Sequence, residues 1–199
     1  MDNWARKFLT EEEYLNLERN SSSKNEFFRG ELFAMAGAKE KHNLIVTNLI
    51  RDISTALKKT PCRVYPSDMR VKVSASGLYT YPDISLVCEK PKFTDGRNNT
   101  LLNPSVIIEV LAESTESYDR GKKFELYRTL PSLKEYILVS SEQKKLESFL
   151  NRADGWMMLE SIIGNHFLIR SLNIFLDIED IARTTRNDIF DLLINQSNG

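Results

Sequence analysis

The sequence has few of the residues that mark specialised protein classes. It holds 2 cysteines and 2 histidines in 199 residues, which is too few for a disulfide framework or a four-thiolate zinc site. We expect Cys62 and Cys88 to be free thiols that pack as small apolar side chains in a reducing compartment. The first ten residues lack the apolar core of a signal peptide, and no run is long enough to span a bilayer. These absences predict a cytoplasmic protein.

Charge of one sign is not in excess either. The chain has 27 Lys and Arg against 28 Asp and Glu, a net charge of -1, so no global positive charge indicates a nucleic-acid partner. Its 41% hydrophobic content is ordinary for a globular protein and excludes disorder as the main state. No internal repeat, low-complexity tract or linker divides it. We expect a single domain over 1–199, with a core at about 26–150 and a C-terminal hairpin and helix as additions at 151–194.

Hydrophobic periodicity predicts an α/β (α+β) protein with a mixed sheet, flanked by helices and extended by hairpins. A capping box at Thr10 opens a short helix, and Gly30 supplies a hairpin turn. The run 106–111 is almost entirely apolar, which is typical of a strand buried on both faces. Helices are expected at 10–18, 42–59, 117–130 and 176–182, and strands at 26–29, 31–35, 62–65, 69–73, 81–88, 106–111, 135–139, 145–150, 156–160 and 167–170, with a polar loop at 89–103.

Glu109 is the sharpest chemical signal, because it is the only charged residue in the strand 106–111. Strand alternation places it on one face with Ile107 and Leu111. A buried and unpaired carboxylate costs several kcal/mol, so a cation or a proton must compensate it. Either a salt bridge to Arg or Lys, or a metal ion shared with a second carboxylate, would do so. Asp83, after Pro82 at the start of an apolar strand, is the candidate for that second carboxylate, although a turn or cap role is equally compatible with its position.

A lysine lies on the apolar face of the next helix. On a helical wheel with Lys123 at 0°, Leu130 falls near -20°, Tyr127 near +40° and Leu126 near -60°. Lys123 therefore faces the sheet, where either a structural or a catalytic lysine would meet an acidic cluster. Asp83 and Glu109 supply hard oxygen ligands that suit Mg²⁺ or Mn²⁺, and a metal beside a lysine suits phosphodiester hydrolysis.

His42 faces inward at the start of the long helix, since Leu49, Ile53 and Val46 lie within 40° of it on the wheel. A hydrogen-bonded interior histidine and a residue at the edge of an active site are both compatible with this position. The second histidine and the cysteines are not at metal-ligand spacing, which argues against zinc.

At these residues the sequence resembles the PD-(D/E)xK nuclease superfamily, in which an acid on one strand is followed by a Glu on the next and a Lys two residues later. Pro82-Asp83 and Glu109 match the acids, but Leu111 stands at the lysine position. Some branches carry the lysine on the following helix, where Lys123 lies. More closely, the chain resembles the Uma2 family, a bacterial group of "putative restriction endonucleases". The matching segments run in order at 28–37, His42 with 48–49, 67–71, 81–84, 103–104, 107–111, 114–115, 119–123, and Tyr127 with 131–136.

The resemblance implies a restriction-endonuclease-like fold and a metal-dependent endonuclease of the cytoplasm. Asp83 and Glu109 would bind Mg²⁺ or Mn²⁺, the Val110 carbonyl would add a ligand, and Lys123 would assist the attacking water. Glu31 and Asp68 would lie near the acidic site as secondary groups, with His42.

Two hypotheses about function remain open at this point. The first is the endonuclease, acting on nucleic acid, with DNA favoured although the residues do not separate DNA from RNA. The second is an inactive nuclease-fold module that binds nucleic acid or a protein, which the near-zero charge and Leu111 favour. A hydrolase of a smaller phosphate ester is a weaker third. Phe27, Phe28 and Phe149 lie in edge-like strands that would need covering, which predicts a homodimer or higher homo-oligomer.

Overall fold

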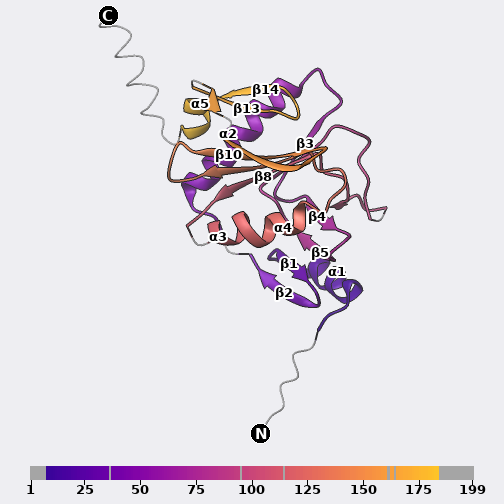
Figure 1. The fold of residues 1–199 in the computed structure, drawn as a ribbon. Helices are drawn as coiled ribbons and strands as arrows, with labels where there is room; N and C mark the ends of the chain where they lie inside the picture. Colours follow the sequence, from indigo (N-terminus) through magenta and orange to yellow (C-terminus); the bar gives the residue numbers. More distant parts are fainter. Residues whose placement is uncertain are drawn as a thin grey trace, which may run out of the picture.

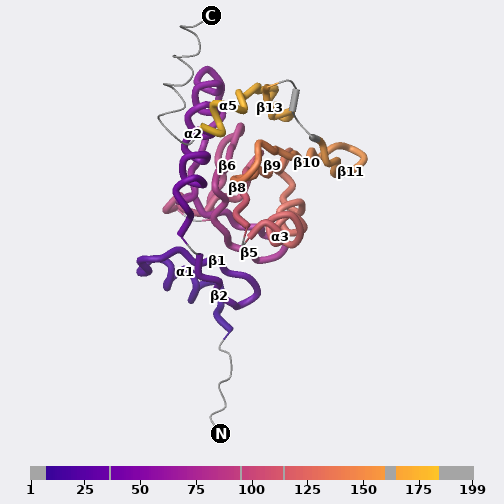
Figure 2. Tube along the Cα trace, turned by 90° about the vertical axis from the view of Figure 1, so that its left-hand side faces the viewer, coloured from indigo at the N-terminus to yellow at the C-terminus, as the bar shows by residue number. Residues whose placement is uncertain are grey.

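The structure is a computed structural model and describes residues 8–35, 37–94, 96–113, 115–160, 162–163 and 165–183. The expectations at Ser114 and at the C-terminal end of the 151–194 addition fall outside these ranges. Figure 1 shows a central sheet with helix α2 on one side and α3 and α4 on the other. Figure 2 shows α1 and the β1–β2 hairpin at the end of the molecule that carries the N-terminus. The predicted mixed α+β class is confirmed.

The central sheet has six strands, and its register places the predicted acids beside each other. β6 runs antiparallel to β8, and β8 runs parallel to β9. β8 is buried on both faces, as the apolar run predicts. In the order β11-β10-β9-β8-β6-β3 the strands are Gly155–Glu160, Leu146–Arg152, Glu135–Ser140, Val106–Leu111, Ile84–Val87 and Arg63–Pro66.

Two apolar layers cover the faces of this sheet. Helix α2 (Glu40–Leu57) packs its buried side chains Ile45, Leu49, Ile53 and Leu57 against one face. The other face packs against Leu126 and Tyr127 of α4 (Phe124–Tyr127). Before α4 the chain forms α3 (Glu116–Tyr118) and a π-helical turn, η1 (Asp119–Lys123). The predicted helix at 117–130 is thus interrupted by a π-helical segment, a feature that is frequent at functional sites.

A five-stranded sheet lies beyond α4 and brings the N-terminal hairpin to the core. Thr10 forms the predicted capping box at the start of α1 (Glu11–Asn20). The hairpin turns at Arg29 and Gly30, whose φ values of 50° and 89° suit a tight turn. In the order β2-β1-β5-β4-β7 the strands are Glu31–Ala34, Asn25–Phe28, Leu78–Thr80, Arg70–Val73 and Thr100–Leu101.

The C-terminal part adds a three-stranded sheet and a short helix over α2. Its strands are β12 (Ile162–Ile163), β13 (His166–Ile169) and β14 (Ile174–Asp177), followed by α5 (Ile178–Ala182). The helix predicted at 176–182 therefore begins two residues late, because Leu176 and Asp177 belong to β14 and Asp177 also caps α5. Similarly, the strand predicted at 81–88 begins at Ile84, since Pro82 has no N–H for a ladder.

The prediction about the two cysteines is wrong. Cys62 and Cys88 are not free thiols but form a disulfide, because the β3–β6 register pairs Arg63 with Val87 and so places the cysteines opposite each other at the end of the strands.

No helix in the described ranges is long and apolar enough to cross a membrane.

The three phenylalanines used to predict an oligomer differ in how far the chain covers them. Phe27 is buried and stacks on Tyr14 at 4.8 Å between ring centroids. Phe28 and Phe149 are partly buried against the apolar layer on the α4 side of the central sheet, where the Phe149 ring centroid lies 4.3 Å from that of Phe124. The homodimer or higher homo-oligomer stays a prediction.

Candidate active site

The site begins with Glu109, whose side chain lies on the α4 side of the central sheet. The residue is 4% exposed. Tyr127 Oη donates a hydrogen bond of 3.0 Å to Glu109 Oε1, and Lys123 Nζ lies 2.9 Å from the same oxygen. Burial raises the pKa of Glu109 to about 8, while the Lys123 ammonium acts in the opposite direction. The buried Glu109 side chain thus lies beside its counter-ion, the Lys123 ammonium.

Asp83 lies next to Glu109 because β6 and β8 pair Ile84 with Ile108. The main chain links the two acids. The Val110 N–H donates to Asp83 Oδ2 at 2.8 Å, and the Asp83 N–H donates to Glu109 Oε2 at 3.3 Å. The Asp83 side chain is 18% exposed and lines a cavity. One carboxylate is therefore open to a ligand while the other is held behind it.

Lys123 is enclosed by three carboxylates. Its Nζ lies 2.9 Å from Glu109 Oε1, 3.4 Å from Asp119 Oδ1 and 3.5 Å from Glu26 Oε1. Although burial opposes the charged form, these carboxylates raise the pKa of Lys123 well above its ordinary value. Lys123 is consequently a fixed cation at neutral pH and a hydrogen-bond donor, not a base.

Glu26, Asp119 and Tyr127 belong to this cluster, and the sequence reasoning did not identify them as site residues. Asp119 precedes Lys123 by four residues, a spacing that places both on one helical face, so the wheel could have found it. Tyr127 was placed in the apolar arc of that wheel, but its hydroxyl reaches Glu109. Glu26 lies on β1, and no local pattern connects that hairpin to the helix.

His42 meets Asp83 at the first turn of α2. Its Nε2 lies 3.1 Å from Asp83 Oδ2, and this hydrogen bond raises the pKa of His42. The other ring nitrogen, Nδ1, is buried and has no hydrogen-bond partner among the residues that the structure describes. His42 thus lies at the edge of the acidic pair, where it supports the orientation of the Asp83 carboxylate.

Glu31 and Asp68 are placed differently from the residues above. Glu31 opens β2 opposite Phe28. Asp68 lies in an exposed turn, where Lys24 Nζ approaches its Oδ1 at 2.6 Å. Neither is among the described residues that line the cavity at Asp83.

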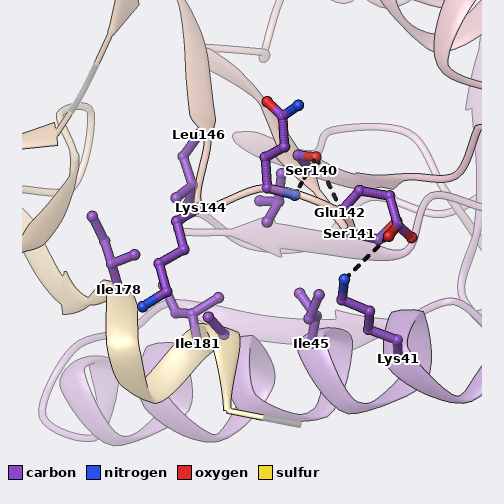
Figure 3. A pocket seen from close by; sticks show the side chains of 12 residues that line it. Lys41, Ile45, Ser140, Ser141, Glu142, Lys144, Leu146, Ile178 and Ile181 are labelled. Carbon is purple, nitrogen blue, oxygen red and sulfur yellow. Dashed lines mark hydrogen bonds and ion pairs between the residues drawn. The ribbon is translucent and has the colours of Figure 1, made fainter.

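The cavity has a volume of about 640 Å³ and is lined by the acidic cluster, by Lys39 and Lys41, and by part of β2. A second cavity of about 180 Å³ lies between α2, the β9–β10 turn and α5. Figure 3 shows Lys41 directed toward Glu142, with Ile45 beside Lys41 and Ile181 farther to the left. The Lys41–Glu142 ion pair, 3.2 Å long, lines both cavities.

The donor set fits a hard cation with few protein ligands. Asp83 and Glu109 offer carboxylate oxygens, and Mg²⁺ is commonly held by one or two carboxylates with several waters. Among the described residues, no three His, Cys, Asp or Glu side chains converge as a metal-binding group. One oxygen of Glu109 already contacts Lys123 and Tyr127. The residues therefore suit an Mg²⁺ or Mn²⁺ ion that keeps several water ligands. They do not suit an ion whose ligands all come from the protein.

Comparisons with known proteins decide the family. A family model described as "Putative restriction endonuclease", Uma2, matches residues 11–176. The chain belongs to the Uma2 family. Two relatives from Synechocystis sp. (strain ATCC 27184 / PCC 6803 / Kazusa) are described as uncharacterized proteins. One is 36% identical over 160 residues, which cover 80% of this chain and 90% of the relative. The other is 32% identical over 177 residues, which cover 88% and 92%.

A solved structure shares the fold. It is described as "Crystal structure of a putative nuclease belonging to DUF820 from Anabaena variabilis ATCC 29413", and it matches with a TM-score of 0.71 at 16% identity. The match covers 87% of this chain and 97% of that one. The restriction-endonuclease-like fold that the resemblance implied is thereby confirmed.

Proposed function

We propose that this Uma2 protein is a metal-dependent endonuclease that hydrolyses phosphodiester bonds in nucleic acid, with DNA as the favoured substrate. The observation that carries the proposal is the triad of Asp83, Glu109 and Lys123, gathered at one cavity of a nuclease-like fold. Two adjacent carboxylates and a buried lysine are the groups that such hydrolysis needs. Work in the cytoplasm stays a prediction, and the Cys62–Cys88 disulfide removes the free thiols that supported it.

Each residue has a distinct part in this proposal. Asp83 and Glu109, with the Val110 carbonyl, would hold Mg²⁺ or Mn²⁺, which supplies a Lewis acid and lowers the pKa of bound water. Lys123 stays protonated between its carboxylates, so it can orient the nucleophile by donating a hydrogen bond and can stabilise charge on the phosphate. Tyr127 and the Asp83 main chain hold Glu109 in place.

The test is cleavage of supercoiled plasmid, single-stranded circular DNA and RNA with Mg²⁺ or Mn²⁺. Asp83→Asn, Glu109→Gln and Lys123→Met should each lower the rate by roughly 100-fold or more. Lys122→Met is the matched control, because Lys122 lies one residue away and its ion pair with Glu125 is exposed. A pure wild-type protein that cleaves none of these substrates with either metal would contradict the proposal.

An inactive nuclease-fold module is the second candidate. Two observations favour it. Glu109 already has a counter-ion in Lys123, and the described residues form no group of three metal-binding side chains. Calorimetric titration with Mn²⁺ separates the two candidates. The endonuclease requires binding that Asp83→Asn abolishes, whereas the module predicts no binding and a Glu109→Gln variant at least as stable as the wild type.

A further inference from the structure

Two aromatic side chains in the cavity are exposed. Among the described residues Phe8 and Phe175 are exposed as well, but neither of them lines this cavity. Phe33 is 47% exposed and Tyr118 is 40% exposed, and both line the cavity that contains Asp83 and Glu109. By contrast, Tyr14, Tyr79, Tyr127 and Tyr136 are fully buried. An exposed aromatic is costly to leave in water, so a pair of them at a functional cavity indicates a ligand with an aromatic or apolar face.

Both aromatics lie beside the charged cluster. Phe33 pairs with Glu26 across β1 and β2, and residues that pair in this way project from the same face of a sheet. Glu26 in turn approaches Lys123 at 3.5 Å. Tyr118 directly precedes Asp119. Partial burial raises the pKa of the Tyr118 hydroxyl, and the nearby Glu26 carboxylate acts in the same direction. Phe33 of β2 and Tyr118 of α3 line the same cavity.

The cavity also has the size and the charged groups that a nucleotide requires. Its volume of about 640 Å³ is within the range of pockets that enclose small ligands. Lys39 and Lys41 line it together with the aromatics. A base inside a duplex has both faces covered by its neighbours. A base can therefore stack on protein rings only when it is unpaired or has been extruded from the helix.

We propose that the cavity accepts an unpaired nucleotide, whose base stacks on Phe33 and Tyr118 while its phosphate lies toward Asp83 and Glu109. The preferred substrate is then a single strand, or a duplex with an unpaired or extruded base. This inference rests on the proposed function in taking nucleic acid as the substrate, and it adds the structural state of that substrate.

The test is fluorescence anisotropy with a labelled single strand of roughly 12 nucleotides and with the corresponding duplex. Ca²⁺, another hard cation with oxygen ligands, is present throughout, and gels monitor cleavage separately. The wild type should bind the single strand more tightly than the duplex. Phe33→Ala and Tyr118→Ala should each weaken single-strand binding by roughly 5- to 100-fold, while Tyr118→Phe should retain it. If Phe33→Ala does not fold, Phe33→Leu keeps the apolar volume and should show the same loss.

Leu32→Ala is the matched control. Leu32 is 39% exposed on the same strand but projects from the opposite face and does not line the cavity. It should change binding by less than about twofold. Equal affinity for single strand and duplex, or unchanged binding by both alanine variants, would overturn the inference. A loss in Leu32→Ala as large as in Phe33→Ala, with a change in sedimentation, would also overturn it and would assign the hairpin to a second copy of the chain.

The binding and cleavage measurements can refute this inference and the proposed function independently of each other. Single-strand binding that depends on Phe33 and Tyr118, without cleavage of any substrate, would support this inference and remove the proposed function. Cleavage that requires Glu109 but is unaffected by Phe33→Ala and Tyr118→Ala would leave the proposed function intact and remove this inference.

Discussion

Replacement of Lys123 by methionine tests the charge arrangement of the site most directly. Methionine keeps most of the side-chain volume but removes the ammonium, and three carboxylates then face one another within 3.5 Å of where Nζ lay. Removal of one partner from a buried ion pair typically costs about 3–5 kcal/mol. We expect a loss of that size in the free energy of unfolding at about pH 8.5, because there the carboxylates must remain charged or take up protons against the solution.

The same cost should shrink at about pH 6. The pKa of Glu109 is already raised by burial, and loss of the lysine raises it further, so protonation relieves the repulsion at lower pH. Urea unfolding followed by circular dichroism, in metal-free buffer at both pH values, measures this difference. The double variant Lys123→Met with Glu109→Gln should recover part of the stability, which a double-mutant cycle quantifies.

Lys122→Met provides the control. Lys122 is 56% exposed on its side chain and pairs with Glu125 at 3.2 Å in solvent, so its loss should cost less than about 1 kcal/mol. If Lys123→Met cost no more than Lys122→Met at about pH 8.5, Lys123 would not be the buried counter-ion of this cluster. The assignment of Lys123 as a fixed cation would then be wrong.

Two further predictions concern pH and the disulfide. The metal-free protein should lose stability as pH rises from about 5 to 8, because burial raises the pKa of Glu109 to about 8 and Asp83 raises that of His42, so the folded state keeps protons that the unfolded state has released. Glu109 contributes at most about 1.4 kcal/mol per pH unit to the fall in the free energy of unfolding. Urea titrations of the Glu109→Gln variant should show a weaker dependence of that free energy on pH. An unchanged dependence would contradict the assignment of the raised pKa to Glu109. Replacement of Cys62 and Cys88 by serine should cost roughly 3–4 kcal/mol, as expected for a cross-link that spans 26 residues, and dithiothreitol should have the same effect on the wild type but none on the variant.

The periodic parts of the fold could be predicted from the sequence, because burial imposes a period on the residues. Alternation in 106–111 correctly separated Ile107, which packs toward α4, from Ile108, which packs toward α2. The disulfide could not be predicted, because it depends on the register of β3 against β6, and nothing local specifies which strands pair. The π-helical turn at η1 also has no signature in hydrophobic spacing.

The candidate site divides in the same way. Glu109 and Lys123 could be found from the sequence because each interrupts an apolar stripe, and an interrupted stripe predicts a compensating partner. Asp119 was accessible by its spacing of four residues from Lys123. Glu26 and Phe33 could not be found from the sequence, because they reach the cavity through the pairing of β1 with β5. That pairing is a contact between segments that share no local pattern. Tertiary arrangement, and not residue type, makes them part of the site.

The chain is nearly neutral overall, but its cavity is locally acidic. Six carboxylates line it, Glu26, Asp83, Glu109, Glu113, Asp119 and Glu142, against three lysines, Lys39, Lys41 and Lys123. This is a formal excess of three negative charges, or of two while Glu109 holds its proton, and it repels phosphate. A divalent cation offsets two negative charges. Nucleic-acid binding, and not only cleavage, should therefore require the cation. In the anisotropy titration, chelation of Ca²⁺ should weaken single-strand binding by roughly 10-fold or more. Equal affinity with and without the cation would show that the substrate lies away from the acidic cluster.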